Sequence, residues 1–244
     1  ELSTITDALR AGATDDRIRA AVLDFGTMGS IPLGMAHAFA DAIDAFRESG
    51  KPVIAVSDFY TQADYFLAAH ADEVYLHPFG QVVLTGYGSH QIYLGATLER
   101  FGVTVNVFRA GAYKAATEPL TRSEMSDEAR ENARALVEGF WAYFRERVAD
   151  RRGLEPAVLD RLADDLPEAL AGTDGDAARL ALESELVDEL LERNQIDDRI
   201  RESTGAPAAA GRRDSTEPGY RAVDFREYAR RMRAERSGEN GPAV

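Results

Sequence analysis

The feature that most constrains the fold is a regular alternation of two hydrophobic patterns along the first half of the chain. Short runs rich in β-branched and aromatic residues, each stopped by Gly, Pro or Asp, predict strands. They cover residues 18–25, 51–59, 72–78, 81–88 and 103–111. Between them lie helical patterns that end before a turn, at residues 33–50, 61–70 and 92–102. The alternation predicts an α/β fold with a mainly parallel, buried sheet.

Helical spacing also predicts which faces are buried. In residues 33–50 the apolar positions recur every three to four residues, at Met35, Phe39, Ile43 and Phe46. The strongest helix signal comes later, with Ser126 as N-cap, an acidic first turn and Gly153 as the stop. Its apolar residues run at helical spacing from Ala129 to Val148, so one wide face is expected to be buried. The pattern of residues 155–203 predicts shorter helices, with helix ends at Gly172 and Gly175.

Changes in composition along the chain predict its domain boundaries. We expect residues 1–205 to form the α/β domain and residues 206–218 to form a linker rich in Ala, Gly and Pro. The pattern of residues 219–236 predicts a short strand followed by an arginine-rich helix. Residues 237–244 are predicted to form a disordered tail. The arginine-rich stretch could bind an acidic membrane surface, but it is short and the chain is acidic, so packing on a partner is favoured.

Charge and residue usage exclude several functions. A net charge of −14 repels phosphate backbones, so nucleic acid is not expected as a partner. The absence of cysteine excludes a thiol nucleophile and a Cys-based metal site. The apolar runs are far shorter than the roughly 18 residues of a membrane span, and the chain starts at Glu1 without a leader pattern. We therefore expect a soluble piece cut from a longer protein.

Lysine use points to one position. Of 28 basic residues only Lys51 and Lys114 are lysine, and the rest are arginine. Arginine stays protonated, whereas a buried lysine can lose its proton and act as a general base. Lys51 lies at a predicted helix-to-strand turn, where a solvated charge is expected. Lys114 lies in the segment GAYKAATEP, where the residue usage raises the question of a chemical role, although a lone lysine is more often a solvated charge.

GAYKAATEP closely resembles the Gly-x-Tyr-Lys…Pro segment of the signal peptide peptidase SppA family, peptidase family S49. Residues 49–88, 93–126 and 220–229 are also similar to the amino-terminal half of the long, two-repeat form of that family. The resemblance implies a fold like ClpP and crotonase, a spiral of ββα units with additional helices. It implies that Lys114 is the general base of a Ser/Lys dyad that degrades remnant signal peptides.

The nucleophile departs from the family pattern. The family serine lies at the start of the helix after the strand at 51–59, where this chain has Gln62. In the long form the first half gives the lysine and the second half gives the serine. The resemblance therefore implies a chain that is inactive alone, with the serine in a second repeat or partner chain. It also implies a homo-oligomer on the outer side of the bacterial cytoplasmic membrane, held by an anchor outside this chain, with no cofactor and no metal.

Other polar residues are weaker candidates. Ser57, Ser123 and Ser126 suit strand ends and caps, while Ser89, in a Gly-rich turn, is the one internal nucleophile worth testing. No metal-ligand spacing links His37, His70, His77 and His90. The loop Asp24–Gly34 lacks phosphate-loop spacing, and its glycines are not paired as an oxyanion hole would need.

Two other classes of function stay open. A repeat without a serine could serve only as a scaffold for a membrane-associated assembly, with Lys114 as an inherited structural residue. A crotonase-like acyl-CoA enzyme could share the fold and hold a thioester oxygen with paired backbone amides. The broken glycine pair counts against the second class.

Overall fold

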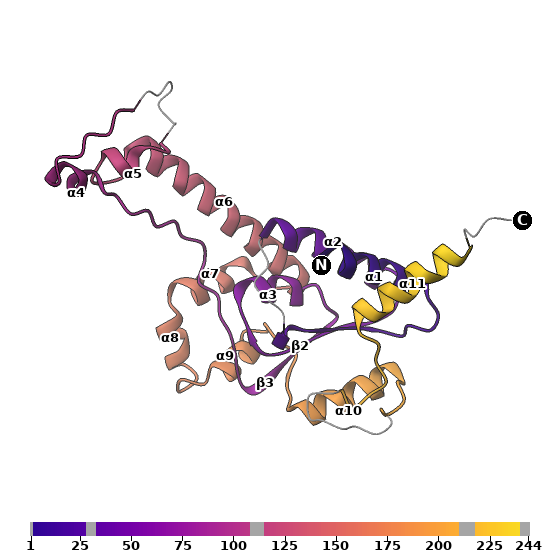
Figure 1. Ribbon diagram of the computed structural model, residues 1–244. Helices are drawn as coiled ribbons and strands as arrows, with labels where there is room; N and C mark the ends of the chain where they lie inside the picture. Colours follow the sequence, from indigo (N-terminus) through magenta and orange to yellow (C-terminus); the bar gives the residue numbers. More distant parts are fainter. Residues whose placement is uncertain (1, 28–32, 108–114, 210–217, 240–244) are drawn as a thin grey trace, which may run out of the picture. The chain divides into compact units, whose positions relative to one another are not determined.

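The computed structural model describes residues 2–27, 33–107, 115–209 and 218–239. The backbone divides into two compact units (Figure 1). The sheet unit contains residues 1–85 and 147–244, and the insert unit contains residues 86–146. Lys114 belongs by sequence to the insert unit but lies outside the described residues.

A four-stranded parallel sheet forms the centre of the sheet unit, in the order β1-β2-β3-β4. The strands are β1 (Ala21–Asp24), β2 (Val53–Tyr60), β3 (Glu73–Val82) and β4 (Glu189–Leu190). The predicted α/β class with a parallel, buried sheet is therefore confirmed. β4 is only two residues long, too short for a hydrophobic pattern to predict.

One strand covers the prediction at 72–78 and the first two residues of the prediction at 81–88, and the strand prediction was wrong for residues 83–88. β3 continues through Pro78 because residues 77–80 are absent from the register with β2, so no ladder hydrogen bond is lost there. The pairing resumes after a bulge, from Ser57 opposite Leu76 to Phe59 opposite Gln81. A Cβ at Gly80 would lie 2.4 Å from the carbonyl oxygen of Asp58, so only glycine fits this approach.

Helices pack around this sheet. They are α1 (Leu2–Thr14), the short 3-10 helix η1 (Phe25–Thr27), α2 (Leu33–Arg47), α3 (Gln62–Ala68), α7 (Pro156–Asp164), α8 (Leu166–Ala171), α9 (Ala177–Glu183), α10 (Arg193–Thr204) and α11 (Phe225–Glu239). Helix α1 packs against α2 and α11, and α9 packs on β3. The core includes Ile54, Val56 and Tyr75 of the sheet with Ile196 and Ile200 of α10. Of the predicted face of α2, only Met35 is exposed.

The insert unit holds α4 (Gly95–Arg100), α5 (Glu118–Thr121) and the first part of α6 (Asp127–Arg152). The predicted bounds of α6 are confirmed, and Gly153 follows it with a φ of +67°. The prediction of one wide buried face was wrong for the part of the helix up to Phe140, where Leu136 and Phe140 are exposed. The prediction of a strand at 103–111 was wrong for residues 103–107, and 108–111 lie outside the described residues.

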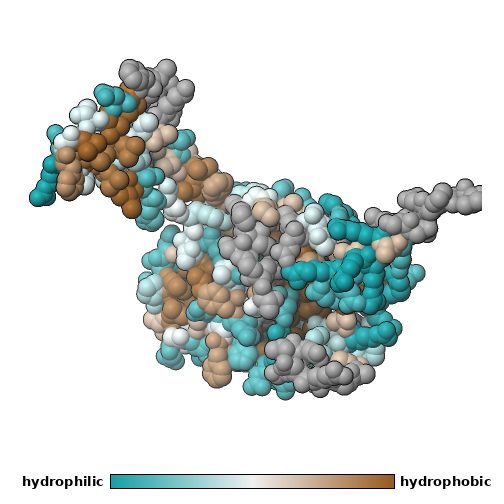
Figure 2. Space-filling model, in the orientation of Figure 1, coloured by the Kyte–Doolittle hydropathy of each residue, from teal (hydrophilic) through white to brown (hydrophobic). Residues whose placement is uncertain are grey.

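Hydrophobic side chains gather on the surface of α4 and α5 (Figure 2). They include Ile92, Leu94, Phe101 and Leu120. Within the described ranges, no helix has both the length and the apolar character needed to cross a bilayer. The insert unit thus exposes apolar area without forming a membrane-spanning segment among its described residues.

Candidate functional site

The start of α3 is the position where the family pattern predicts the nucleophile. β2 ends at Tyr60, Thr61 is the N-cap and Gln62 is the first residue of the helix. The Gln62 side chain is half-buried, and its Oε1 accepts a hydrogen bond from the backbone N–H of Thr85 at 2.9 Å. An amide cannot attack a carbonyl carbon, so this residue fixes the chain that leads out of β3 and is not a nucleophile.

The β2–α3 junction is held rigidly. Thr61 and Asp64 form a capping box, in which the Thr61 Oγ1 accepts from the Asp64 N–H and the Asp64 carboxylate accepts from the Thr61 N–H. The Tyr60 hydroxyl donates to the carbonyl of Tyr75 at 3.0 Å, and the Tyr65 hydroxyl donates to that of Leu186 at 2.7 Å. Burial raises the pKa of Tyr60 well above its ordinary value. The Thr-x-x-Asp spacing is a local sequence signal from which this cap could have been predicted.

The predicted base, Lys114, lies outside the described residues, so the structure gives no distance between it and any serine. The description resumes at Ala115, and α5 begins four residues after the lysine, at Glu118. Glu118 is 2% exposed, although a carboxylate is costly to bury without partners. Ser126 supplies two of them, its hydroxyl donating to Oε1 at 2.7 Å and its N–H to Oε2 at 3.1 Å.

The same serine caps α6. Its Oγ accepts a hydrogen bond from the N–H of Ala129 at 3.2 Å, as the sequence predicted for Ser126. Glu118 was not predicted, because nothing in the local sequence signals a buried carboxylate. The pair closes residues 118–126 into a turn that begins four residues after Lys114.

Backbone bonds tie α4 to α5. The N–H of Leu94 donates to the carbonyl of Pro119 at 2.7 Å, and that of Gly95 donates to the carbonyl of Arg122 at 3.0 Å. A Cβ at Gly95 would lie 2.5 Å from that carbonyl oxygen, so the approach requires glycine. These bonds and the Glu118–Ser126 pair form the frame of the insert unit on the carboxyl-terminal side of Lys114.

The remaining serines and Lys51 have structural contacts or surface positions. The Ser57 hydroxyl, 4% exposed, donates to the carbonyl of Phe59 at 2.7 Å within the β2 bulge. Ser89 and Ser123 are exposed. The Lys51 ammonium donates to the carbonyls of Gly12 and Asp15, both at 2.8 Å. These two hydrogen bonds hold Lys51 at the helix-to-strand turn. We expected a solvated charge there, whereas the residue is partly buried.

The glycine loop and the histidines complete the predicted candidates. Asp24 Oδ1 accepts from the N–H of Gly26 at 3.0 Å, while residues 28–32 of the loop lie outside the described part. Among the described residues no cluster of three His, Asp or Glu side chains could hold a metal ion. His70 is fully buried, and its Nδ1 lies 2.9 Å from Asp44 Oδ1.

Asp44 joins His70 to two arginines. Its Oδ2 lies 2.5 Å from the Arg151 guanidinium and 3.7 Å from that of Arg147. Burial acts to raise the pKa of Asp44, but the hydrogen bond from His70 and the charges of His70, Arg151 and Arg147 outweigh it and lower the pKa. The Nε2 atom of His70 is buried and unpartnered in the described structure. We interpret this network as structural, because it links α2, the turn after α3 and the end of α6.

Comparison with known proteins identifies relatives along most of the chain. The model of peptidase family S49 matches residues 45–201. Protease 4 of Salmonella typhi is 32% identical over 237 residues, which are 97% of this chain and 37% of that protein. Protease 4 of Haemophilus influenzae is 31% identical over 79% of this chain and 31% of the relative. The chain thus spans about a third of the length of these curated relatives.

Solved structures give more distant likenesses. An enoyl-CoA hydratase/isomerase family protein from Silicibacter pomeroyi is 18% identical, with a TM-score of 0.28 over 75% of this chain and 84% of that one. Pseudomonas aeruginosa DspI is 15% identical, with a TM-score of 0.27 over 82% and 84%. At these TM-scores the likenesses carry no argument, and the fold assignment rests on the parallel sheet and the family match.

Proposed function

The chain belongs to peptidase family S49, and from that membership we propose that it supplies the general base of a Ser/Lys peptidase. The base is Lys114, and the serine comes from a second repeat or a partner chain. The observation that carries the proposal is the combination of the family match over residues 45–201 with Gln62 at the expected serine position. A chain with the lysine segment and without the nucleophile is one half of an active site.

The reaction follows from the chemistry of an amine base. Neutral Lys114 takes the proton of the serine hydroxyl as the oxygen attacks the peptide carbonyl carbon. The C–N bond then breaks, and the Lys114 ammonium returns the proton to the leaving amine. Water attacks the acyl-enzyme by the same route and restores the serine. Burial against the serine-bearing part would lower the pKa of the lysine into the working range.

The remaining parts of the proposal come from the family resemblance. The substrates are remnant signal peptides, which enter as extended chains. The assembly is a homo-oligomer at the outer face of the bacterial cytoplasmic membrane, anchored by a segment that this chain does not contain. The exposed apolar side chains of the insert unit support a contact with another part of the assembly.

The test is peptide hydrolysis by the full-length protein with Lys114 replaced. Lys114→Ala removes the base, and Lys114→Arg keeps the positive charge but cannot accept a proton. Both variants should lower kcat by about 10²–10⁴-fold on a fluorogenic peptide, the range of a general base. Lys51→Arg is the matched control, because its ammonium serves two backbone carbonyls, and it should retain activity.

The outcomes separate the candidate functions. Unchanged hydrolysis by Lys114→Ala would refute the proposal, and Ser89 would be the next nucleophile to replace. A full-length protein without hydrolytic activity would favour the scaffold function, for which the exposed apolar surface of the insert unit is the supporting observation. Tight binding of acyl-CoA would favour the crotonase-like alternative.

A further inference from the structure

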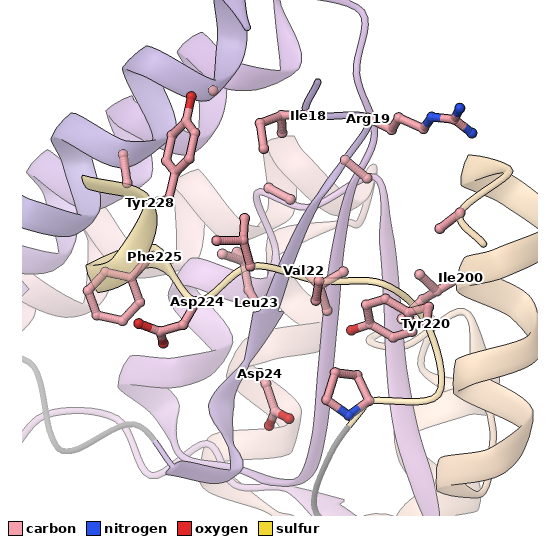
Figure 3. A pocket seen from close by; sticks show the side chains of 18 of the residues that line it. Ile18, Arg19, Val22, Leu23, Asp24, Ile200, Tyr220, Asp224, Phe225 and Tyr228 are labelled. Atoms are coloured by element: carbon pink, nitrogen blue, oxygen red, sulfur yellow. The ribbon is translucent and has the colours of Figure 1, made fainter. Parts of the chain in front are cut away.

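A cleft of about 1210 Å³ follows β1 in the sheet unit and has no role in the proposed chemistry (Figure 3). It is larger than the roughly 300–1,000 Å³ of most small-molecule pockets. Eight consecutive residues line it, from Arg17 to Asp24, and the last four of them are β1. Side chains alternate between the two faces of a strand, so an unbroken run of lining residues means that the cleft follows the edge of β1.

That edge is unpaired within the described structure, where β1 is hydrogen-bonded to β2 alone. The N–H of Ala21 donates to the carbonyl of Pro52 at 3.0 Å, so the polar backbone groups of Ala21 face toward β2. Backbone direction alternates along a parallel strand, so the N–H and C=O of Val22 face the cleft. An edge of this kind is a template for another strand.

The walls of the cleft are mainly apolar. Leu23 and Phe39 lie on the side of α1 and α2, and Val22 and Tyr220 pack on the core beneath α10. Met35 is 44% exposed, although its helical spacing predicted a core position. Figure 3 shows the segment from Tyr220 to Phe225 forming a further wall. A backbone edge between two apolar faces matches a strand with apolar side chains on both of its faces.

We propose that the cleft holds an added β-strand of about four residues, supplied by a part of the same full-length polypeptide outside these 244 residues. That length matches β1, whose four residues from Ala21 to Asp24 line the cleft. The strand would pair with the outward backbone groups of Val22 and cover Met35. The sheet would then have five strands, with β1 inside it.

Two observations favour the same polypeptide over a substrate or a second copy. The matched residues make up only 37% of the Salmonella typhi relative, so proteins of this family contain much more chain than is described here. Helices α1 and α11, from opposite ends of the sequence, meet beside the cleft, where the Tyr228 hydroxyl donates to Asp15 at 2.9 Å. Polypeptide continuous with either helix would have a high effective concentration at the cleft.

The test is photo-crosslinking in the full-length protein with benzoylphenylalanine in place of Met35 or, separately, Val223. Both residues line the cleft, and they are 44% and 38% exposed. The expected product is an intramolecular cross-link from each position to one common extended segment outside residues 1–244. Leu182 is the matched control, since it is 37% exposed and does not line the cleft, and the probe there should not reach that segment.

Cross-links to a second copy or to a bound peptide substrate, or none within the chain, would overturn the proposal. Where the probe prevents folding, amide hydrogen exchange of the unmodified full-length protein decides. An added strand should slow exchange of the Val22 N–H by about a hundredfold or more. Exchange at the rate of an open edge would overturn the proposal. Neither measurement depends on Lys114, so this inference and the proposed function can fail separately.

Discussion

Helices α3 and α4 are almost equally long but are buried to opposite degrees. Five of the seven residues of α3 are buried, and none of the six of α4. Phe66 in α3 is 0% exposed, whereas Phe101, directly after α4, is 76% exposed. Removal of apolar area from water is the main source of folding stability. The sheet unit therefore contains its own core, while the insert unit leaves large apolar side chains exposed.

Helix α6 shows the same contrast within one element. Leu136 and Phe140 are 55% and 42% exposed, while Phe144 and Val148, nearer its carboxyl end, are 0% exposed. The part of the helix up to Phe140 carries the apolar spacing of a buried face without being buried. The proposed base, Lys114, belongs by sequence to the unit with the exposed surface. The contrast supports a chemistry that depends on contacts from outside this chain.

The largest expected effect is a difference in the free energy of unfolding between a substitution in the sheet unit and one in the insert unit. Phe66→Ala should lower the free energy of unfolding by about 3–5 kcal/mol, because it removes a fully buried ring from a close-packed core. Phe101→Ala should change it by no more than about 0.5 kcal/mol. Urea denaturation of both variants measures the difference. Equal losses would mean that the insert unit has a core that the exposed fractions do not reveal.

Local sequence patterns predicted much of the fold for physical reasons. The bounds of α6 followed from Ser126 and Gly153, because capping is decided by neighbouring residues. The bulge that joins two predicted strands into β3 could not be predicted, since it depends on the approach of Gly80 to Asp58 on another strand. The exposure of Leu136 could not be predicted either. Helical spacing of apolar residues predicts an apolar face but does not predict which residues cover it.

The candidate site was predictable only in part. The lysine segment is contiguous, so its resemblance to the family predicts Lys114 as the base, and this stays a prediction. The strand-to-helix order located Gln62 at the start of α3. The buried Glu118 was missed because its partner, Ser126, lies eight residues away and forms the pair only after the turn has folded. The Asp44–His70 pair was missed because it joins residues far apart in the sequence.

The second prediction tests the polar network of the sheet unit. Asp44→Asn should destabilise the protein by about 1.5–3 kcal/mol at pH 7, because it removes the charge that faces Arg151 and accepts from His70. Asp41→Asn is the control on the same helix, where the side chain is 55% exposed, and it should cost less than about 1 kcal/mol.

The pH dependence of this network has a defined sign. The pKa of Asp44 is lowered in the folded state, so its stabilisation is complete above the unfolded pKa of about 3.9 and is lost as the pH falls through the lower folded value. The stability gap between the wild type and Asp44→Asn should therefore narrow below about pH 4. Denaturation curves at several pH values measure it, and a gap that widens in acid would contradict the assignment.

The third prediction concerns the apolar surface of the insert unit. Phe101→Ser in the full-length protein should weaken self-association or the contact with the serine-bearing part by about tenfold or more, because a buried large apolar side chain contributes about 1.5–3 kcal/mol. Phe79→Ser is the control, since Phe79 is 95% exposed on β3 of the sheet unit. Sedimentation velocity over a range of concentrations measures both. A larger effect from Phe79 would reverse the comparison.

The smallest expected effect comes from the hydrogen bonds of Ser126 to Glu118 and to the first turn of α6. Ser126→Ala removes the cap of α6 and the hydroxyl that donates to Glu118, and should cost about 0.5–2 kcal/mol. The loss should be local, so amide exchange should quicken in the first turn of α6 and around Glu118 while β2 is unchanged. Ser123→Ala, at an exposed position three residues earlier, should have no effect.

The same pair of variants distinguishes a positioning role from a purely structural one. Glu118 begins α5 four residues after Lys114, so removing the hydroxyl that donates to its carboxylate should loosen the frame on that side of the lysine. In the full-length enzyme, Ser126→Ala should then lower kcat for peptide hydrolysis and shift the acid limb of its pH profile, while Ser123→Ala shifts neither. If Ser126→Ala quickens exchange and leaves the pH profile unchanged, the Glu118–Ser126 pair stabilises α6 without orienting the base.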